Sequence, residues 1–399
     1  MYTGEIYITG TGVVTPLGVG MESFRQNIAA GKCAITRIPD MEDDAAAFAG
    51  LIQEFDPRTY LSAKLCQDLE PYARYAYIAA EEALHMSGLD PEGGRVGIVM
   101  ASALSGMNII GQTNVKWQVQ GRQAGPKYLT KTMGNVAASY FAINHYITGP
   151  DMTVSTACSS GGDAITLAAM MLRMDMADAV IVMAGESAVS RTLIQSLKKT
   201  GALSKTGCSR PFDKNRDGFV LGEGAGALVI EKSEMTRSRG AEPLAKLLGC
   251  ANNNDAYNPV SPDPCGSGAG ACIEEAIRQA KITPYDIGYV NLHGTATHIG
   301  DIAESCAITS VFKDYAVPAS STKGATGHMM GAGGVVEVIC CIEAVRTGIL
   351  PVNVGFSEAD PECALNIITE NGTKHDIKAA MSDALGFGGQ NSCVIVGRV

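Results

Sequence analysis

The stretch Val154-Ser155-Thr156-Ala157-Cys158-Ser159-Ser160-Gly161-Gly162 decides the fold. The β-branched and apolar residues before Cys158 predict a short buried strand, and residues 163–174, rich in Ala, Leu and Met, predict a helix. Cys158 is therefore expected at a strand-to-helix turn near a helix N-terminus. Free backbone N–H groups and the helix dipole stabilise an anion there, so we expect a lowered thiol pKa and a nucleophilic thiolate.

Two histidine segments further along the chain give this cysteine a chemical context. His293 lies in Asn291-Leu292-His293-Gly294-Thr295-Ala296-Thr297, at the end of a predicted strand over 288–292. Lys323 and His328 lie in Ser321-Thr322-Lys323-Gly324-Ala325-Thr326-Gly327-His328, between a predicted strand over 318–321 and a predicted helix over 331–347. Sites in layered α/β proteins are built at such strand ends. A thiol and two imidazoles suit carbon–carbon bond formation on a thioester, which makes Cys158, His293, His328 and Lys323 candidate catalytic residues.

Glu337 lies on the helix that follows His328, and its role has two interpretations. The simpler one is a carboxylate on a solvated helix face. The alternative is an ion pair with Lys323 that would hold the Lys323–His328 loop in place as structural support.

These segments belong to a pattern that runs through the whole chain. The chain resembles an elongating, type II-like β-ketoacyl-acyl-carrier-protein synthase, a ketosynthase and condensing enzyme of the thiolase-fold superfamily. Besides the segments around Cys158, His293 and His328, the stretches that carry the resemblance are Ile8–Gly18, Arg210–Phe219, Gly222–Gly226 and Leu385–Asn391.

The resemblance implies an α/β fold, thiolase-like, with five layers αβαβα built from two duplicated halves. The first half would span residues 1–239, with the nucleophile and an insertion over about 102–146 that lies over the pocket and the dimer interface. The second would span residues 240–399, with the His/Lys/His set and a Gly-Phe-Gly-Gly gate. Continuous apolar runs at 96–100 and 179–183 predict strands that are buried on both faces.

The resemblance also implies a role for each matching residue. Cys158 would hold the acyl chain as a thioester, and its N–H group and that of Phe387 would form the oxyanion hole. His293 and His328 would stabilise the enolate that forms when malonyl thioester loses CO2, and Lys323 would organise the site. The remaining implied positions are Gly386 and Gly388 beside the Phe387 gate, Thr295 and Thr297 in the phosphopantetheine channel, and Leu104 and Leu197 in the acyl pocket.

Several positions depart from the pattern of this family. His298 stands where relatives usually have Pro, Val260 where many have Thr, and Gln390 where Thr is commoner. We favour a substituted loop position for His298 over a third imidazole near the channel. A predicted helix over 62–74 contains Lys64, Gln67, Asp68 and Glu70 and is less basic than expected for docking an acidic carrier, which Lys198, Lys199 and Lys205 would offset.

Composition narrows the class of protein. The net charge of −10 argues against nucleic-acid binding. The twelve cysteines are scattered without metal-ligand spacing, so we expect no metal site and a reduced, cytoplasmic compartment. The sequence has no signal-peptide pattern at residues 1–10 and no apolar stretch long enough to span a membrane.

The leading interpretation is decarboxylative condensation of malonyl-acyl carrier protein with an acyl group on Cys158, in fatty acid or polyketide chain elongation. No cofactor is expected, because the substrates ride on the phosphopantetheine of the carrier. The alternative is the ketosynthase subunit of a heterodimeric polyketide-like synthase that needs a chain-length-factor partner. A non-catalytic subunit would lack the nucleophile, a degradative thiolase would have a second catalytic Cys near the C-terminus, and a priming ketosynthase would have Asn in place of His328.

Overall fold

The strands of the two halves follow one plan. A computed structural model describes residues 1–39, 41, 44, 47–372 and 374–399. In the first half the spatial order is β6-β5-β7-β9-β1, and in the second it is β12-β11-β14-β15-β10, with β13 added outside β12. Their bounds are β1 (Ile6–Thr15), β5 (Val96–Ala101), β6 (Asp151–Val154), β7 (Ala179–Glu186), β9 (Gly224–Lys232), β10 (Ala245–Asn254), β11 (Ile287–Asn291), β12 (Pro318–Ser320), β13 (Asn366–Ile367), β14 (Ala379–Gly386) and β15 (Gln390–Gly397).

The strand directions repeat as well. In each half the outer two pairs are parallel (β5 with β6 and β7; β11 with β12 and β14), and the inner two are antiparallel (β7–β9–β1; β14–β15–β10). The two sheets join where Ile6–Ile8 of β1 pairs with Ala245–Leu247 of β10. This repetition confirms the predicted duplication.

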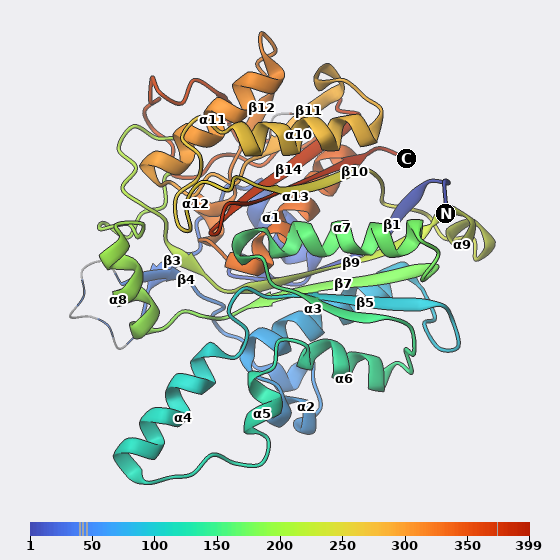
Figure 1. Cartoon of the computed structure of the whole chain (residues 1–399), viewed down its shortest axis with the longest axis vertical. Helices are drawn as coiled ribbons and strands as arrows, with labels where there is room; N and C mark the ends of the chain where they lie inside the picture. Colours follow the sequence, from blue (N-terminus) through green and yellow to red (C-terminus); the bar gives the residue numbers. More distant parts are fainter. Residues whose placement is uncertain (40, 42–43, 45–46, 373) are drawn as a thin grey trace.

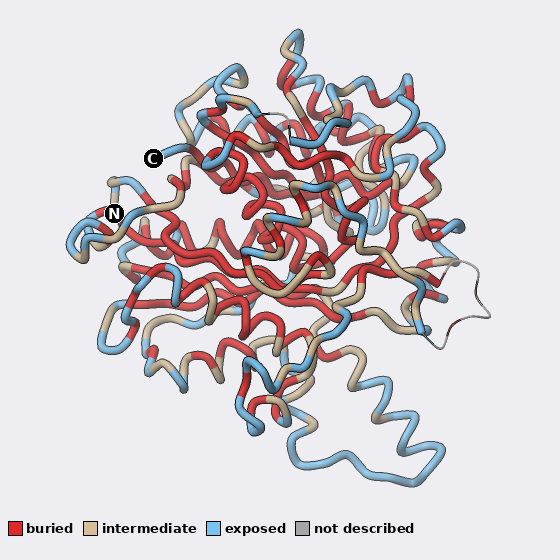
Figure 2. Tube along the Cα trace, turned by 180° about the vertical axis from the view of Figure 1, so that it is seen from behind, coloured by how far each residue is buried: buried red, intermediate tan, exposed pale blue. Residues whose placement is uncertain are grey.

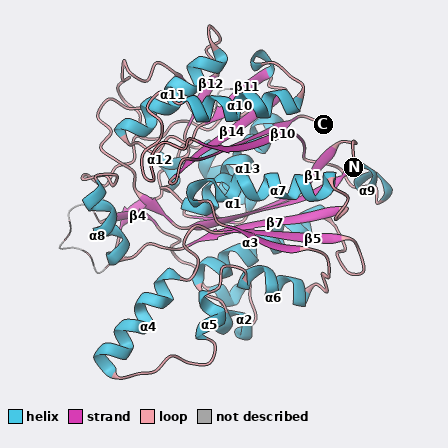
Figure 3. Ribbon diagram, viewed as in Figure 1, coloured by secondary structure: helices cyan, strands magenta, loops and turns pink. Residues whose placement is uncertain are grey.

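Helices complete the five layers (Figure 1, Figure 3). The middle layer contains α7 (Ser160–Arg173) and α13 (Gly333–Thr347), which contact strands of both sheets. The outer layers contain α3 (Pro71–Ser87) and α6 (Val136–Asn144) on one side, and α10 (Ser267–Ala280) and α11 (His298–Phe312) on the other. The remaining helices are α1 (Met21–Ala29), α2 (Ala63–Asp68), α4 (Met107–Gln120), α5 (Tyr128–Thr132), α8 (Arg191–Thr200), α9 (Ser233–Ser238) and α12 (Lys323–Thr326). A small separate sheet contains β3 (Ile35–Arg37), β4 (Phe48–Gly50) and β8 (Leu221–Gly222), and β2 (Gly18–Val19) pairs with the end of β1.

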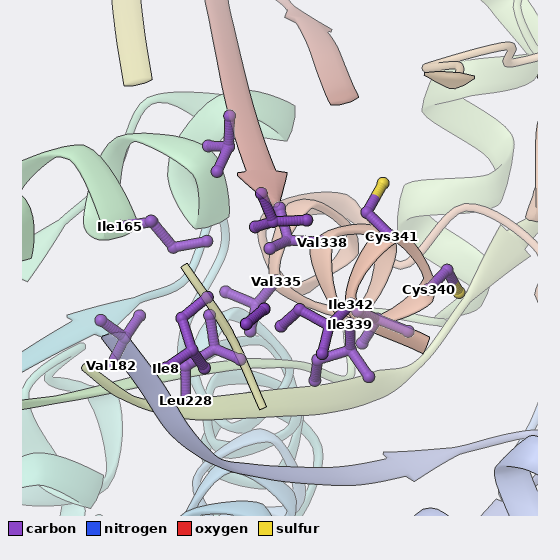
Figure 4. Packing of buried hydrophobic residues seen from close by; sticks show 14 of the residues in the cluster. Ile8, Ile165, Val182, Leu228, Val335, Val338, Ile339, Cys340, Cys341 and Ile342 are labelled. Carbon is purple, nitrogen blue, oxygen red and sulfur yellow. The ribbon is translucent and has the colours of Figure 1, made fainter. Parts of the chain in front are cut away.

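The middle layer is the core of the molecule. Val335 and Ile339 of α13 pack with Leu228, Ile8 and residues of α7 in one buried cluster (Figure 4). Burying an aliphatic side chain of this kind contributes about 1.5–3 kcal/mol. Because α13 is apolar nearly all round, it is buried along its length, and its N-terminus is held rigidly beside the site.

Two expectations need correction. The strand before Cys158, β6, is not buried, because it is the edge strand of its sheet and its residues alternate between exposed and half-buried. The insertion does not lie over the pocket as a whole. Only its start, at Ala103 and Leu104, packs near Cys158, while α4 projects from the body with none of its residues buried (Figure 1, Figure 2).

Two compositional findings accompany the fold. Each of the twelve cysteines, all within the described residues, is unpaired. Among the helices that the structure describes, none has the length and apolar character needed to cross a membrane.

Candidate active site

Cys158 lies in a short 3-10 turn (Ala157–Ser159) that runs directly into α7. Ala157 has a φ of 52°, in the left-handed region that a residue with a Cβ occupies at a cost of about 1–3 kcal/mol. Ser160 holds this turn: its hydroxyl donates to the Ala157 carbonyl at 2.6 Å and accepts the Thr156 N–H at 2.9 Å. The strained turn presents the thiol at the start of the helix, as predicted.

The environment of the thiol differs from the prediction. Cys158 is 6% exposed, and burial raises the pKa of its thiol to about 11, while the Lys323 charge and the Phe387 N–H lower that pKa only in part. The expected lowering of the thiol pKa is therefore wrong for the resting site. Burial destabilises the thiolate more than the Lys323 charge and the Phe387 N–H stabilise it. The thiol is protonated at rest and needs a base.

His328 lies beside the thiol, and its ring nitrogen can accept the thiol proton in one of its two neutral tautomers. Its Nε2 lies 3.1 Å from Cys158 Sγ. The His328 N–H donates to the Val220 carbonyl at 2.7 Å, and the His328 carbonyl accepts the Gly222 N–H at 2.8 Å, so the segment is fixed like a strand beside β8. The Phe219 ring meets the imidazole edge-on, with centroids 5.4 Å apart.

His293 follows β11 and reaches the same point from the other sheet. The rings of His293 and His328 are nearly perpendicular, at 84°, with centroids 5.4 Å apart. Cys158 Sγ and one ring nitrogen of each histidine all lie within 4.8 Å of one another. Burial, followed by the nearby Lys323 charge, holds the pKa of both imidazoles well below the usual value, so both are neutral.

Lys323 and Glu337 form a buried ion pair. Both side chains are 2% exposed, and Lys323 Nζ donates to Glu337 Oε1. The ion-pair interpretation of Glu337 is therefore confirmed, and the solvated helix face is wrong. The pair joins α12 to α13 and places a cation behind both histidines.

A pocket of about 250 Å³ leads from the surface to this cluster. Phe387 is half-buried on its wall, and its N–H donates to Cys158. Thr295 and Thr297 also line the pocket, with their hydroxyl oxygens 3.0 Å apart. Leu104 and Leu197 lie elsewhere: both belong to the apolar cluster around Cys158, outside the pocket lining.

The loop that carries Phe387 is tied to a segment that the sequence did not single out. The Gly388 N–H donates to the Pro259 carbonyl at 2.8 Å, and Asn254 Nδ2 donates to the Gly388 carbonyl at 2.7 Å. Gly386 packs against Ser159, where a Cβ would lie 3.0 Å from the hydroxyl oxygen. The run Asn252-Asn253-Asn254-Asp255 at the end of a strand was the available signal for this anchor.

Two of the three departures from the family pattern, His298 and Val260, line the pocket. His298 is exposed and begins α11, while Val260 and Ile299 place apolar side chains, each more than half exposed, on the rim. Gln390 begins β15, and its carbonyl accepts the Ser159 hydroxyl at 2.7 Å.

The acidic residues of the predicted 62–74 helix do not form an exposed acidic face. The helix breaks at Leu69, between α2 and α3. Asp68 is buried and accepts from Lys127 and Tyr140, and Glu70 pairs with Lys131 at 2.9 Å. Both carboxylates are thus neutralised by the insertion.

With the site in view, the sequence comparisons decide the family. The family model "Beta-ketoacyl synthase, N-terminal domain" matches residues 3–235, and "Beta-ketoacyl synthase, C-terminal domain" matches residues 244–357. The chain belongs to the β-ketoacyl synthase family. A 3-oxoacyl-[acyl-carrier-protein] synthase 2 of Coxiella burnetii (strain RSA 493 / Nine Mile phase I) is 34% identical over 410 residues, covering 99% of each chain.

Solved structures of β-ketoacyl synthases share the whole fold. The ishigamide ketosynthase/chain length factor matches with a TM-score of 0.94 and 27% identity. A type II PKS acyl-carrier protein in complex with its ketosynthase matches with a TM-score of 0.90 and 27% identity. Both matches cover 100% of either chain, so this β-ketoacyl synthase has the thiolase-like architecture throughout and is a condensing enzyme of the acyltransferase class.

Proposed function

We propose that the chain condenses an acyl group held on Cys158 with a malonyl group carried by an acyl carrier protein, with loss of CO2. The observation that carries this proposal is the convergence of one thiol and two neutral imidazoles within 4.8 Å at the inner end of a pocket. Cofactor-free chemistry is part of the proposal, because each step is assigned to side chains of the chain and to the phosphopantetheine arm.

In the first step Cys158 Sγ attacks the thioester carbonyl of the acyl carrier. His328 Nε2, 3.1 Å away, accepts the thiol proton, which the departing pantetheine thiolate takes up. The N–H groups of Cys158 and Phe387 form the oxyanion hole. The Phe387 N–H donates to the sulfur at rest and would turn to the carbonyl oxygen of the bound thioester, where the negative charge develops.

In the second step the malonyl carbonyl oxygen lies between His293 and His328. Breaking the bond to the carboxylate releases CO2 and leaves an enolate, whose oxygen accepts hydrogen bonds from the two imidazoles. The enolate carbon attacks the acyl-Cys158 carbonyl, the carbon–sulfur bond breaks, and the Cys158 thiolate takes up one proton from solvent, which is the proton that the overall reaction consumes. A neutral imidazole donates from one ring nitrogen only, so His328, whose Nε2 accepts the thiol proton in the first step, changes tautomer before it donates to the enolate oxygen.

Lys323 is proposed to organise the site. Its charge is neutralised by Glu337, yet it lowers the pKa of both imidazoles and so keeps them neutral. Phe387, flanked by Gly386 and Gly388, would gate the acyl pocket. Thr295 and Thr297 would line the pantetheine channel, and Leu104 and Leu197 would contact the acyl chain in the cluster around Cys158.

A second thiolase-fold chain is proposed to pair along β6. This edge strand is unpaired on its outer side among the described residues, and the nearby α4 exposes Val115, Trp117 and Val119 by 59% to 77%. A copy of this chain or a chain-length-factor-like subunit would suit this edge. The heterodimeric alternative is favoured by likeness to the ishigamide ketosynthase/chain length factor.

The carrier protein is proposed to dock at the pocket mouth, in the cytoplasm. Val260 and Ile299 offer an apolar rim. Lys199 and Lys205 are exposed and flank the segment 200–202 that lines the pocket. Since Asp68 and Glu70 are neutralised by Lys127 and Lys131, they add little repulsion for an acidic carrier.

Intact-protein mass spectrometry tests the proposal. The purified chain is mixed with an acyl-acyl carrier protein and then with malonyl-acyl carrier protein, with Cys158→Ala as the control. Gain of the acyl mass on Cys158, followed by its loss with release of a β-ketoacyl carrier, supports a self-sufficient synthase. Acylation that stalls until a related subunit is added supports the heterodimer. A folded chain that is never acylated by any carrier contradicts the proposal.

A further inference from the structure

Two buried carboxylic acids lie beneath the His293–Gly294 turn and take no part in the proposed chemistry. Glu304 comes from α11 and is 1% exposed, and Asp383 comes from β14 and is 3% exposed. They lie 79 positions apart in the sequence. The fold brings them together only because β14 pairs directly with β11, the strand that ends before His293.

Each acid uses one oxygen to hold the turn. Asp383 Oδ1 accepts the His293 N–H at 3.3 Å, and Glu304 Oε2 accepts the Gly294 N–H at 2.8 Å. Both second oxygens, Asp383 Oδ2 and Glu304 Oε1, are buried and meet no donor among the described residues. The two carboxyl groups are close enough to share a side-chain hydrogen bond when one of them is protonated.

Two ionised carboxylates have no proton with which to make that bond. A single proton held between the two carboxyl groups satisfies both, whereas two buried carboxylate oxygens left without a partner destabilise the folded state. We propose that Asp383 and Glu304 share one proton and act together as positioning residues that fix the backbone of His293 for condensation. This role rests on the proposed function, but the shared proton does not.

The surrounding charges favour the singly protonated pair. Burial raises the pKa of Asp383 to about 7 and that of Glu304 well above its usual value; the Asp383 charge raises the pKa of Glu304 further, while the interaction with Glu304 lowers that of Asp383. Lys323 lowers the pKa of both, but its charge is already engaged by Glu337. The other titratable groups that interact with the pair are Asp301 of α11, Glu337 and Cys341 of α13, Cys272 of α10 and Cys393 of β15.

Losing the shared proton would change the site in two ways. The two carboxylates would repel each other and pull on the two N–H groups that they hold. The added negative charge beside His293 would also favour its protonated form and remove a neutral donor. Activity and stability should therefore both fall on the alkaline side.

Amide variants separate a shared proton from ordinary packing. In Asp383→Asn the amide oxygen can accept the His293 N–H while the NH2 group donates to Glu304, so no proton is needed. In Glu304→Gln the amide oxygen can accept the Gly294 N–H, while the NH2 group donates to Asp383. In the double variant, two NH2 groups face each other and neither finds an acceptor. The exposed Asp90→Asn is the matched control for removing one carboxylate.

The experiment measures urea unfolding of the full chain from pH 5 to pH 9, with the relative rate of malonyl-carrier decarboxylation over the same range. A carboxyl whose pKa is raised on folding stabilises most below its unfolded pKa, and that stability is lost as pH rises through the folded pKa. Wild type and Asp90→Asn should therefore lose stability together towards pH 9. Asp383→Asn should lose less, and its alkaline activity limb should move up by about one pH unit or more.

The infrared spectrum and the double variant provide further outcomes. The infrared difference spectrum between wild type and Asp383→Asn should contain the carbonyl stretch of one buried protonated acid, over the constant contribution of other buried acids such as Glu186 and Asp301. The double variant should be less stable than the two single effects predict. An unchanged pH slope in both single variants, or an additive double variant, would overturn the shared proton; should Asp383→Asn not fold, Glu304→Gln decides. The unfolding and infrared measurements do not depend on turnover. If they give the expected results and the chain does not condense acyl and malonyl groups, the shared proton stands and only the proposed function is rejected.

Discussion

The two halves of this β-ketoacyl synthase share a scaffold and differ in what they place on it. Both have the same strand order and directions, and each sends one helix, α7 or α13, into the middle layer. The first half places a thiol at the start of its helix, and the second places Lys323 and His328 before its own. The duplicated fold therefore makes two helix starts converge, and the difference in sequence at those starts provides nucleophile and donors.

The halves differ again at their outer edges. The connection between β11 and β12 is α11, which packs into the body, whereas the connection between β5 and β6 contains the projecting α4. β12 is covered by β13, while β6 has no outer neighbour in the described part of the sheet. The second half thus covers its edge strand with its own β13, whereas the first half leaves β6 open to pairing with another chain.

The largest expected effect comes from removing the nucleophile of the first half. Cys158→Ala should abolish acylation and lower condensation by on the order of 10⁴-fold or more, while keeping the fold. Cys158→Gln should still release CO2 from malonyl carrier, because its amide resembles the acylated thiol. Intact mass and CO2 release measure both effects, with Cys272→Ala as a buried-cysteine control. Condensation at the wild-type rate in Cys158→Ala would remove this residue from the chemistry.

The next effect comes from the donors of the second half. His328→Ala should slow decarboxylation by about 10²–10³-fold, since one preorganised donor is lost where charge develops. Acylation should slow less, which single-turnover mass measurements can separate. The remote His145→Ala, whose imidazole contacts Glu81, is the control. Equal loss of both steps would mean that His328 acts before decarboxylation or supports the fold.

The ion pair of the second half should matter for stability as well as for activity. Lys323→Met should lower the free energy of unfolding by about 3–5 kcal/mol, because it leaves Glu337 charged and buried without a partner. Lys323→Met combined with Glu337→Leu should recover much of that loss while activity stays low. Urea denaturation measures the stabilities, and a double variant as unstable as the single one would count against the pair.

The smallest effect should come from the arm of the first half. Asp68→Asn weakens the bonds from Lys127 and Tyr140 that tie the insertion to α2. We expect faster tryptic cleavage at the exposed Arg122 and a loss of unfolding free energy of about 1–3 kcal/mol at most. Asp90→Asn is again the control, and unchanged cleavage would show that the arm is held by other contacts.

The sequence predicts most of the scaffold and the central residues of the site. Short motifs at strand ends place Cys158, His293, Lys323 and His328, because local patterns determine where a strand stops. Layer order and duplication follow from the family resemblance, and the strand order confirms them.

What the sequence does not predict depends on distant neighbours. The exposure of β6 depends on strand order, and the thiol pKa depends on burial by several elements. Asp68 looks like a surface charge until Lys127, 59 positions away, is seen beside it. The Asp383–Glu304 pair is likewise invisible until β14 pairs with β11.

The open edge strand has one further consequence. β6 ends at Val154, and only Ser155 and Thr156 separate it from the turn that contains Cys158. A chain that added a strand along this edge would form backbone hydrogen bonds with β6, the strand that leads into the Cys158 turn. Assembly and reactivity would then be mechanically coupled, so the two subunits of such a pair could sense each other's acylation without any dedicated relay.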